Sequence, residues 1–476
     1  MKNIKRIFAA ALCSALVVTI CGCGDKKQTD SGTVSGGNNS TTANVSQEFL
    51  DSLKGMEIKI AYPDKMRNPG QSPADDEWQM IVNKVGKELG VTIREEFFTN
   101  KANGGTFITE SLSGNNSGNV EVVWFTNAFS GVQKNAWAKL DDAAKEAGVS
   151  FNSEWAFTPT TKACNINGGQ YGIQYKTQFV DYPAIYYNVN MITKDNKLED
   201  PYELYKKGEW TFDKFEEYCR KLTKTDASGA ISTYGCQLPA AAWIQYFVNA
   251  NGGSLGRIDG DGKWKQTLSD SKTVNAYNYI YKWMYTDKCV YIPSGTWGTS
   301  FQNLWDGTTA MALGSCAAAS DSYLKQKDEG GMGVVPMPKG PDADDSDVLF
   351  ATGGFAYVIP VAYQKDAAKY LYVIDQLSKR WYENFDSYYS TQFAAIFKDR
   401  KYYDFFKGMY RNDLLTKIDE STLSLVPDSS GYSGSMLSVS ITSGSSPATA
   451  ISKFASAMQN QSDDVRGDTR YTGFSK

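Results

Sequence analysis

The stretches EIKIAY at residues 57–62 and VEVVWF at residues 120–125 decide the fold of this chain. The first has the pattern of a short β-strand, and the second is almost continuously apolar, as expected for a strand covered on both faces. Gly90 ends a helix between them, and a further strand-like run follows at residues 91–98. The apolar residues of that helix recur at helical spacing and are Trp78, Ile81, Val82, Val85 and Leu89. With a weaker helical stretch at residues 107–112, this order predicts a βαβαβ unit with a parallel sheet.

A second α/β region begins near Tyr171. Residues 185–188 have the pattern of a strand, and Thr211 is placed to cap a helix that buries Phe212, Phe215, Cys219 and Leu222. The remaining predicted elements are helices at 240–250, 272–285 and 367–377 and strands at 309–313 and 353–359. At 476 residues the chain is too long for one small core, so we predict two packed α/β lobes.

Composition excludes several classes of function. The chain has no histidine, which removes Ser-His-Asp and Cys-His catalysis and histidine-based zinc sites. Its formal net charge is −4, whereas a partner with a phosphate backbone requires a basic surface. We therefore expect no nucleic-acid partner.

The N-terminus has the pattern of an export signal. Lys2, Lys5 and Arg6 precede a short apolar run at residues 7–20, which falls short of the roughly 20 residues that a membrane-spanning helix needs. The sequence ICGC at residues 20–23 resembles a bacterial lipobox, with Cys23 as the lipidated residue; an ordinary secretory signal is the alternative. We predict a lipoprotein signal peptide at 1–22 and a flexible tether at 23–54, because that segment is rich in Gly, Ser, Thr and Asn.

Cysteine and acidic residues give no metal signature. Five cysteines follow the leader without CxxC spacing, so we interpret them as small buried apolar residues, with one disulfide left open and no pair assignable. The acidic runs 259–263 and 342–347 depart from a calcium-binding loop, and we interpret them as a hairpin turn and a solvated loop. No nucleotide-binding motif and no nucleophile elbow is present.

Several segments in a fixed order resemble the extracellular solute-binding lipoproteins of bacterial ABC importers, in particular the sugar-type group that resembles maltose-binding protein. These segments lie at residues 121–125, 136–140, 168–175, 185–190, 201–223, 301–311, 333–341 and 353–360. The resemblance implies a two-lobed α/β fold like that of periplasmic binding proteins, with a hinge and an interlobe cleft. By analogy the first lobe comprises residues 55–178 plus 342–378, and the second comprises 179–341 plus 379–476.

The same resemblance implies a function. The protein would be a monomer anchored by lipid at the extracellular face of the membrane. It would capture an oligosaccharide or another small polar solute and deliver it to an ABC permease, without turnover, metal or cofactor. Closure of the lobes around the ligand would supply the form that the permease recognises.

Aromatic residues make up 13% of the chain, and sugar rings suit flat aromatic platforms edged by polar groups. Most such residues pack in cores, so position after a predicted strand selects the candidates. Tyr432 is included because it stands in a Gly/Ser-rich loop, and Trp297 and Tyr323 because they could fill the space left by the small residues 314–319. The full set of candidate ligand-binding residues is Phe125, Asn127, Phe129, Asp181, Tyr182, Gln237, Trp243, Tyr246, Trp297, Tyr323, Phe355 and Tyr432.

Three alternatives remain open from the sequence. A surface glycosidase that uses paired carboxylates needs no histidine. A protein of the same fold could bind a peptide, a polyol phosphate or a metal chelate in place of a sugar. A surface adhesin or sensory partner could keep the fold without transport.

Overall fold

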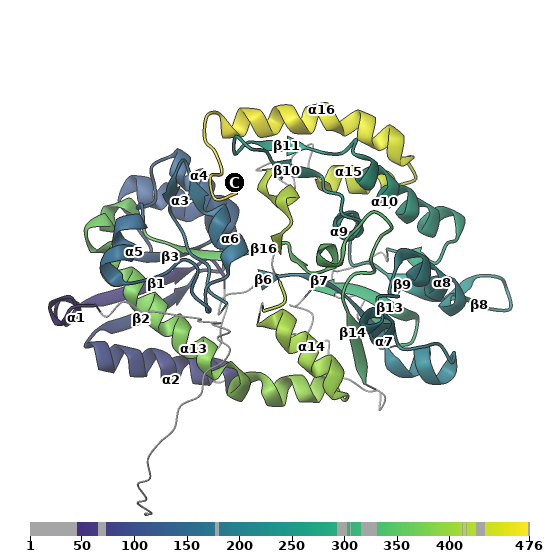
Figure 1. The fold of residues 1–476 in the computed structure, drawn as a ribbon, viewed down its shortest axis with the longest axis horizontal. Coiled ribbons are helices and arrows are strands. Elements are labelled where there is room, and N and C mark those ends of the chain that lie inside the picture. Colours follow the sequence, from purple (N-terminus) through teal and green to yellow (C-terminus); the bar gives the residue numbers. More distant parts are fainter. Residues whose placement is uncertain are drawn as a thin grey trace, which may run out of the picture. The chain divides into compact units, whose positions relative to one another are not determined.

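The computed structural model describes residues 45–64, 73–176, 180–292, 302–304, 306–315, 331–411, 413–415, 417–424 and 434–474. Every described residue belongs to one compact unit within Thr42–Lys476, and Figure 1 labels its helices and strands. The predicted signal peptide and Cys23 lie outside the described residues. No helix in the described ranges combines the length and the apolar character that crossing a bilayer requires.

The first sheet has the strand order β2-β1-β3-β16-β6. Strands β1, β2 and β3 run parallel, which confirms the predicted βαβαβ unit, whereas β16 is antiparallel to both of its neighbours, β3 and β6. The strands are β1 (Glu57–Tyr62), β2 (Thr92–Phe97), β3 (Val120–Trp124), β16 (Gly353–Val358) and β6 (Val180–Asp181). Helix α2 (Pro73–Leu89) connects β1 to β2, and α3 (Gly105–Ser113) precedes β3. Gly90 follows α2 with φ 69°, a left-handed conformation that favours glycine.

Helix α13 (Ala367–Ile396) is much longer than the predicted helix at 367–377. It packs against α2 and α5 (Asp141–Ala147) and continues to α14 (Arg400–Tyr410). Helix α1 (Gln47–Leu53) lies inside the predicted tether, is capped by the Ser46 side chain and buries Phe49 and Leu53. That part of the predicted tether is therefore a packed helix.

The second sheet has the strand order β12-β9-β13-β7-β14, with β8 paired to β9. Strands β9, β12 and β13 run parallel, and β7 is antiparallel to both β13 and β14. These strands are β7 (Pro183–Asn188), β8 (Lys224–Thr225), β9 (Ile231–Gln237), β12 (Val290–Tyr291), β13 (Thr309–Ser315) and β14 (Met332–Val335). Since β6 pairs with the first sheet and β7 begins two residues later, the chain crosses from one sheet to the other at Tyr182.

The helices predicted after Thr211 and at 272–285 are present around the second sheet. The Thr211 side chain accepts a hydrogen bond from the Lys214 amide and caps α8, which buries the four predicted residues. The predicted helix at 240–250 is a 3₁₀ turn, η3 (Ala241–Ile244), followed by α9. The helices here are α7 (Pro201–Lys206), α8 (Phe212–Leu222), α9 (Gln245–Ala250), α10 (Ser271–Tyr281), α15 (Gly434–Thr442) and α16 (Pro447–Arg466).

Shorter elements complete the described chain. Residues 259–263 form the predicted hairpin turn, because the Asp259 amide bonds to the Lys263 carbonyl between β10 and β11. The predicted solvated loop at 342–347 is partly ordered: Asp344 caps a 3₁₀ helix, and Asp342 accepts from the Asn251 side chain. The remaining helices are α4 (Phe125–Gln133), α6 (Thr158–Ala163), η1 (Ala102–Gly104), η2 (Asn190–Asp195), η4 (Lys282–Thr286), η6 (Asp345–Val348), η7 (Val361–Asp366) and η8 (Glu420–Ser424). The remaining strands are β4 (Asn165–Ile166), β5 (Gly169–Gln170), β10 (Gly256–Ile258), β11 (Trp264–Gln266), β15 (Phe350–Ala351) and β17 (Lys417–Ile418).

The last residues of the chain return from α16 to elements near the first sheet. Tyr471 forms a bridge with Ile166, and its ring lies 4.4 Å from that of Phe129 on α4. The side chain of Gln133 donates to the carbonyl of Arg466, at the end of α16, at 2.7 Å. Because Tyr471 is fully buried, this C-terminal segment is part of the packed structure.

Asp200 joins three elements around the second sheet. Its carboxylate accepts hydrogen bonds from the hydroxyls of Tyr187 on β7 and Tyr402 on α14, and it pairs with Lys401 at 2.8 Å. It also caps α7 through the Tyr202 amide at 2.9 Å. Burial alone would raise the pKa of Asp200, but the hydrogen bonds from Lys401 and the two tyrosines hold that pKa below its usual value.

Candidate functional site

The carboxyl edge of the first sheet brings together segments that are distant in the sequence. Trp124, the last residue of β3, is the register partner of Phe355 on β16, and Gly353 is the partner of Asp181 on β6. Open α/β sheets bind ligands beyond the carboxyl ends of their parallel strands. This edge is therefore the candidate ligand surface of the first sheet.

Trp124 keeps part of its surface exposed at this edge, as do Phe97 and Phe98 at the end of β2. The Trp124 ring meets Phe355 edge-on, with centroids 5.1 Å apart and planes at 79°, and lies 5.5 Å from the ring of Phe125. A Cβ atom at Gly353 would lie 2.2 Å from Cζ2 of Trp124 and 2.8 Å from Cε1 of Phe125. Glycine at position 353 is therefore required for the Trp124 ring to take this orientation.

The second sheet has a corresponding edge. Gln237 ends β9, its register partner Tyr291 ends β12, and Ser315 at the end of β13 is the partner of Pro183. The Gln237 side-chain oxygen accepts a hydrogen bond from the Asn303 amide at 2.8 Å. Because the chain passes from β6 to β7 through Tyr182, a single short segment reaches the edges of both sheets.

Five of the predicted aromatic residues are core residues in this structure, namely Phe125, Phe129, Tyr182, Tyr246 and Phe355. Phe125 is fully buried and begins α4, so the strand predicted to end at residue 125 ends one residue earlier. Phe129 is also fully buried, against Tyr471 and the Arg466 guanidinium, whose carbon lies 5.8 Å from the ring centroid. Tyr182 and Phe355 are buried as well, the first with its ring 6.4 Å from that of Phe406.

The other described candidates differ in how accessible they are. Asn127 is half-buried, and its side chain donates to the Asn103 carbonyl at 2.8 Å. Trp243 is half-buried against the buried Tyr246, with ring centroids 5.3 Å apart. Gln237 is only 2% exposed, and its side-chain oxygen already accepts the hydrogen bond from the Asn303 side chain.

The structure therefore gathers only some of the predicted residues at one edge. Phe125, Asp181 and Phe355 meet around Gly353, whereas Gln237 belongs to the edge of the other sheet and Trp243 and Tyr246 to η3 and α9. Of Asp181 only the backbone is described, and Trp297, Tyr323 and Tyr432 lie outside the described residues.

Sequence reasoning missed Trp124. The sequence pattern places Trp124 inside the buried run 120–125, and the predicted ligand contacts begin at the following residue. The signal was present, because a tryptophan at the last position of a buried strand is the first side chain that can reach the carboxyl edge.

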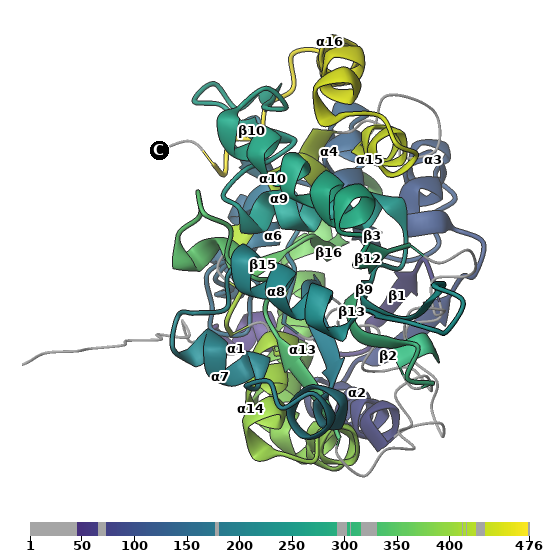
Figure 2. The ribbon, with the colours of Figure 1, turned by 90° about the vertical axis from the view of Figure 1, so that its right-hand side faces the viewer.

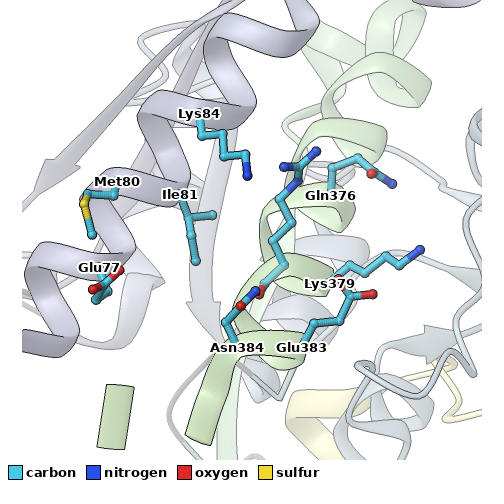
Figure 3. A pocket seen from close by; sticks show the side chains of 9 residues that line it. Glu77, Met80, Ile81, Lys84, Gln376, Lys379, Glu383 and Asn384 are labelled. Atoms are coloured by element: carbon cyan, nitrogen blue, oxygen red, sulfur yellow. The ribbon is translucent and has the colours of Figure 1, made fainter. Parts of the chain in front are cut away.

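Three hollows in the described residues lie away from these edges. The first, of about 430 Å³, lies where α2 meets α13, and Figure 3 shows the side chains of the two helices that line it. Long charged side chains line it, and Met80 and Ile81 are its apolar members. The second, of about 270 Å³, is lined by Tyr205, Trp210 and Lys339, and the third, of about 300 Å³, by Asn249, Arg257 and Asp419.

Burial raises the pKa values of four carboxylates, those of Glu121, Asp375, Asp419 and Glu420, and the first two do not stand at an edge. Burial raises the pKa of Glu121, in the amino half of β3, to about 8, although the Ser117 amide bonds to it at 3.2 Å. Burial also raises the pKa of Asp375, on α13, to about 6, and the Trp155 indole donates to it at 2.8 Å. Among the described residues, no group of three or more acidic or thiol side chains is arranged to hold a metal ion.

Neither a protein-family model nor a curated protein matches this sequence. Solved structures do. The GacH receptor of Streptomyces glaucescens, solved without ligand and with acarbose, aligns with a TM-score of 0.59 at 16% identity, over 87% of this chain and 99% of that one. An extracellular solute-binding protein from Staphylococcus aureus in complex with maltose aligns with a TM-score of 0.60 at 14% identity, over 86% and 98% of the two chains.

UgpB from Mycobacterium tuberculosis, in complex with glycerophosphocholine, aligns with a TM-score of 0.59 at 16% identity, over 86% of this chain and 98% of that one. The alignments span both sheets and nearly the full length of each relative. The chain therefore has the two-lobed α/β fold of the solute-binding proteins of ABC importers, as the sequence predicted.

Proposed function

We propose that this protein is an extracellular solute receptor of an ABC importer, anchored to the membrane by a lipid on Cys23. It captures an oligosaccharide or a similar polar solute between its two lobes and delivers it to a permease without chemical change. The structural relatives are binding proteins, and their ligands include acarbose, maltose and glycerophosphocholine.

The observation that carries the proposal is the position of Trp124. Trp124 is half-buried and lies at the carboxyl edge of the first sheet, next to the segment that crosses to the second sheet. Phe355 and Gly353 fix the orientation of its ring. A fixed aromatic face matches the flat C–H face of a sugar ring, and Asn127 on the adjacent α4 offers a polar group for hydroxyls.

Hydrogen-bonding groups from the second lobe would complete the ligand contacts. The edge of the second sheet ends in Gln237, and Trp243 follows on η3 with part of its ring exposed. A ligand that touches both edges favours the closed form, because its affinity is higher where both sets of contacts are made. We also retain Asp181, Trp297, Tyr323 and Tyr432 as candidate contacts.

Titration of intrinsic fluorescence tests the ligand class. The chain from residue 24 onward is purified and titrated with a panel of maltodextrins, other oligosaccharides, polyols and glycerophosphocholine. A sugar that binds with micromolar affinity, corresponding to about 8 kcal/mol, should change the tryptophan emission and raise the thermal midpoint. A flat response to every sugar, with stabilisation by another solute, would refute the sugar assignment.

Two further measurements separate the rival functions. Overnight incubation with the bound oligosaccharide should release no reducing ends, whereas release that depends on the protein would identify a glycosidase. Membrane fractionation tests the anchor: Cys23→Ala should free the protein from the membrane, while the matched control Cys21→Ala should not. Release by both variants or by neither would contradict lipidation of Cys23.

A further inference from the structure

The end of the chain pairs with the β4–β5 hairpin. The Asn167 amide donates to the Arg470 carbonyl at 3.0 Å, and the Thr472 amide donates to the Asn165 carbonyl at 2.9 Å. The Thr472 hydroxyl accepts a hydrogen bond from the Gly168 amide at 2.8 Å and donates one to the Asn165 side chain at 2.6 Å. Backbone and side chain together therefore fix the segment to this hairpin.

The opposite side of the same segment contacts the hairpin between β10 and β11. The Tyr471 amide donates to the Gly262 carbonyl at 2.9 Å, and Figure 2 shows the end of the chain beside β10. Gly262 has a φ of 75°, and a Cβ atom there would lie 2.6 Å from the Tyr471 carbonyl oxygen. Because successive amides of an extended chain point in opposite directions, residues 470–472 lie between the two hairpins as a short middle strand.

The two hairpins belong to different parts of the fold. The β4–β5 hairpin leads into Ile173, which exchanges two backbone hydrogen bonds, at 3.1 and 2.8 Å, with Tyr357 of β16 in the first sheet. The β10–β11 hairpin is held instead by α16, because the Gln266 amide of β11 donates to the Gln459 side chain at 2.8 Å. The end of the chain therefore joins the first sheet to the helices around the second sheet.

The two attachments of the segment differ in strength. Several hydrogen bonds and the burial of the Tyr471 ring against Phe129 hold it to the side of the first sheet. Within the described chain, a single hydrogen bond, from the Tyr471 amide to Gly262, holds it to the β10–β11 hairpin. If the two hairpins move apart, we expect the contact with Gly262 to break first.

This arrangement has an energetic cost at Arg466, the last residue of α16. Arg466 is 2% exposed, and its guanidinium carbon lies 5.6 Å from the ring centroid of Tyr471 and 5.8 Å from that of Phe129. Its Nη2 atom donates to the Leu423 carbonyl and the Ser462 hydroxyl, whereas Nε and Nη1 find no hydrogen-bond partner in the described part of the chain. The two rings offset only part of the cost of burying this cation, so its return to water would favour release.

We infer that residues 467–474 form a clasp between the two lobes, which favours the lobe separation of this structure and releases at Gly262 when the lobes move apart. The inference rests on the proposed opening and closing of the lobes around a solute. Gly467, with φ 57°, follows α16 and is the pivot of the clasp. Because four residues span at most about 14 Å, the link from Arg466 to Arg470 also limits how far the hairpins can separate.

Hydrogen exchange tests where the clasp releases. The amides of Tyr471 and Thr472 are neighbours in the sequence, but they bond to different hairpins. In the ligand-free chain from residue 24 onward, we expect the Tyr471 amide to exchange about tenfold faster after correction for intrinsic rates, because lobe separation breaks its bond alone. Equal protection of the two amides, or slower exchange at Tyr471, would overturn release at Gly262.

Small-angle X-ray scattering of ligand-free variants tests whether the clasp sets the lobe separation. Gly262→Ala and Thr472→Val each loosen one end of the clasp, so both should increase the radius of gyration. Gly229→Ala is the control for alanine at a positive φ, because Gly229 has a φ of 83° and no atom within 4 Å of its Cβ position. Thr469→Val is the control for Thr472, because the Thr469 hydroxyl makes no hydrogen bond to the described residues.

Two scattering results would overturn the clasp. The first is an unchanged radius of gyration in both anchor variants, with the near-ultraviolet circular dichroism of the parent protein. The second is an equal increase in the two control variants. If an anchor variant does not fold, the exchange rates of the parent protein decide. Since neither measurement contains a ligand, a failure of sugar binding in the fluorescence titration is distinguishable from a failure of the clasp.

Discussion

Phe355 supports Trp124 edge-on, at 5.1 Å between ring centroids and 79° between ring planes, across the antiparallel pairing of β16 with β3. Edge-to-face pairs of this kind are favoured by the quadrupoles of the two rings and hold one ring in a defined orientation. Because the buried Phe355 fixes it, the exposed part of Trp124 is ordered before any ligand arrives.

Replacing Trp124 with alanine should weaken sugar binding. We expect the dissociation constant to rise by about 30-fold, because loss of a stacked ring removes about 2 kcal/mol of binding free energy. Isothermal calorimetry measures the change, and Trp124→Phe, which keeps a ring, should lose less. An unchanged dissociation constant in a folded Trp124→Ala protein would remove this residue from the site.

Gly353→Ala should displace Trp124 without removing it. The added methyl group would lie 2.2 Å from the indole, so either the ring or β16 has to shift. We expect both a lower thermal midpoint and weaker ligand binding. Gly260→Ala is the matched control, because nothing lies within 4 Å of a Cβ at this hairpin position. Equal behaviour of the two variants would contradict the packing argument.

Glu121 should make the protein less stable as the pH rises. Its pKa is about 8 in the folded protein against an ordinary 4.5, so between these values the folded state binds more protons than the unfolded state. Stability is therefore fully present below the ordinary pKa and falls as the pH rises through about 8, by about 2–4 kcal/mol in total.

Glu121→Gln tests this sign. The variant should unfold at a higher urea concentration than the parent protein at pH 8 and should lose the slope between pH 6 and pH 8. That window avoids Asp375, whose own raised pKa of about 6 gives a slope at lower pH. A parent protein whose unfolding midpoint rises from pH 6 to pH 8 would contradict the assignment.

Asp200→Ala should be strongly destabilising. It removes the acceptor shared by Tyr187, Tyr402 and Lys401 and leaves the two buried hydroxyls without it. We expect a loss of about 3 kcal/mol in the free energy of unfolding, measured by urea denaturation. Because the pKa of Asp200 is held low, the parent protein should lose this contribution as the pH falls through that pKa, and Asp200→Asn should not.

Asp404→Ala is the control for Asp200. Asp404 is a carboxylate on the same α14, paired with Arg400 four residues earlier, at an exposed position. Exposed pairs of this type contribute little, so the unfolding free energy should change by less than about 0.5 kcal/mol. If both variants lose the same stability, the shared-acceptor argument for Asp200 fails.

The local pattern of the sequence was sufficient to predict several elements of each lobe, but not α14, α15 or α16. The apolar run at 120–125 and the helical repeat from Trp78 to Leu89 identified β3 and α2, and Thr211 identified the start of α8. Each of these signals depends only on neighbouring residues. The antiparallel pairing of β16 with β3 joins residues more than two hundred positions apart in the sequence, and no local pattern encodes this pairing.

The candidate site was harder to predict for the same reason. Phe125 and Phe129 are buried because α4 begins at residue 125 and turns both rings inward, and a one-residue difference in the end of β3 decides this. Phe129 further depends on Tyr471, which closes over it from the opposite end of the sequence. Burial of this kind is a property of tertiary packing.

The packing of Tyr471 against Phe129 and Ile166 determines where a label fused to the C-terminus lies. A fluorophore or affinity handle fused behind this residue would sit beside α4 and β4, although it follows α16 in the sequence. Shortening the chain to remove Tyr471 for a fusion would uncover the buried ring of Phe129.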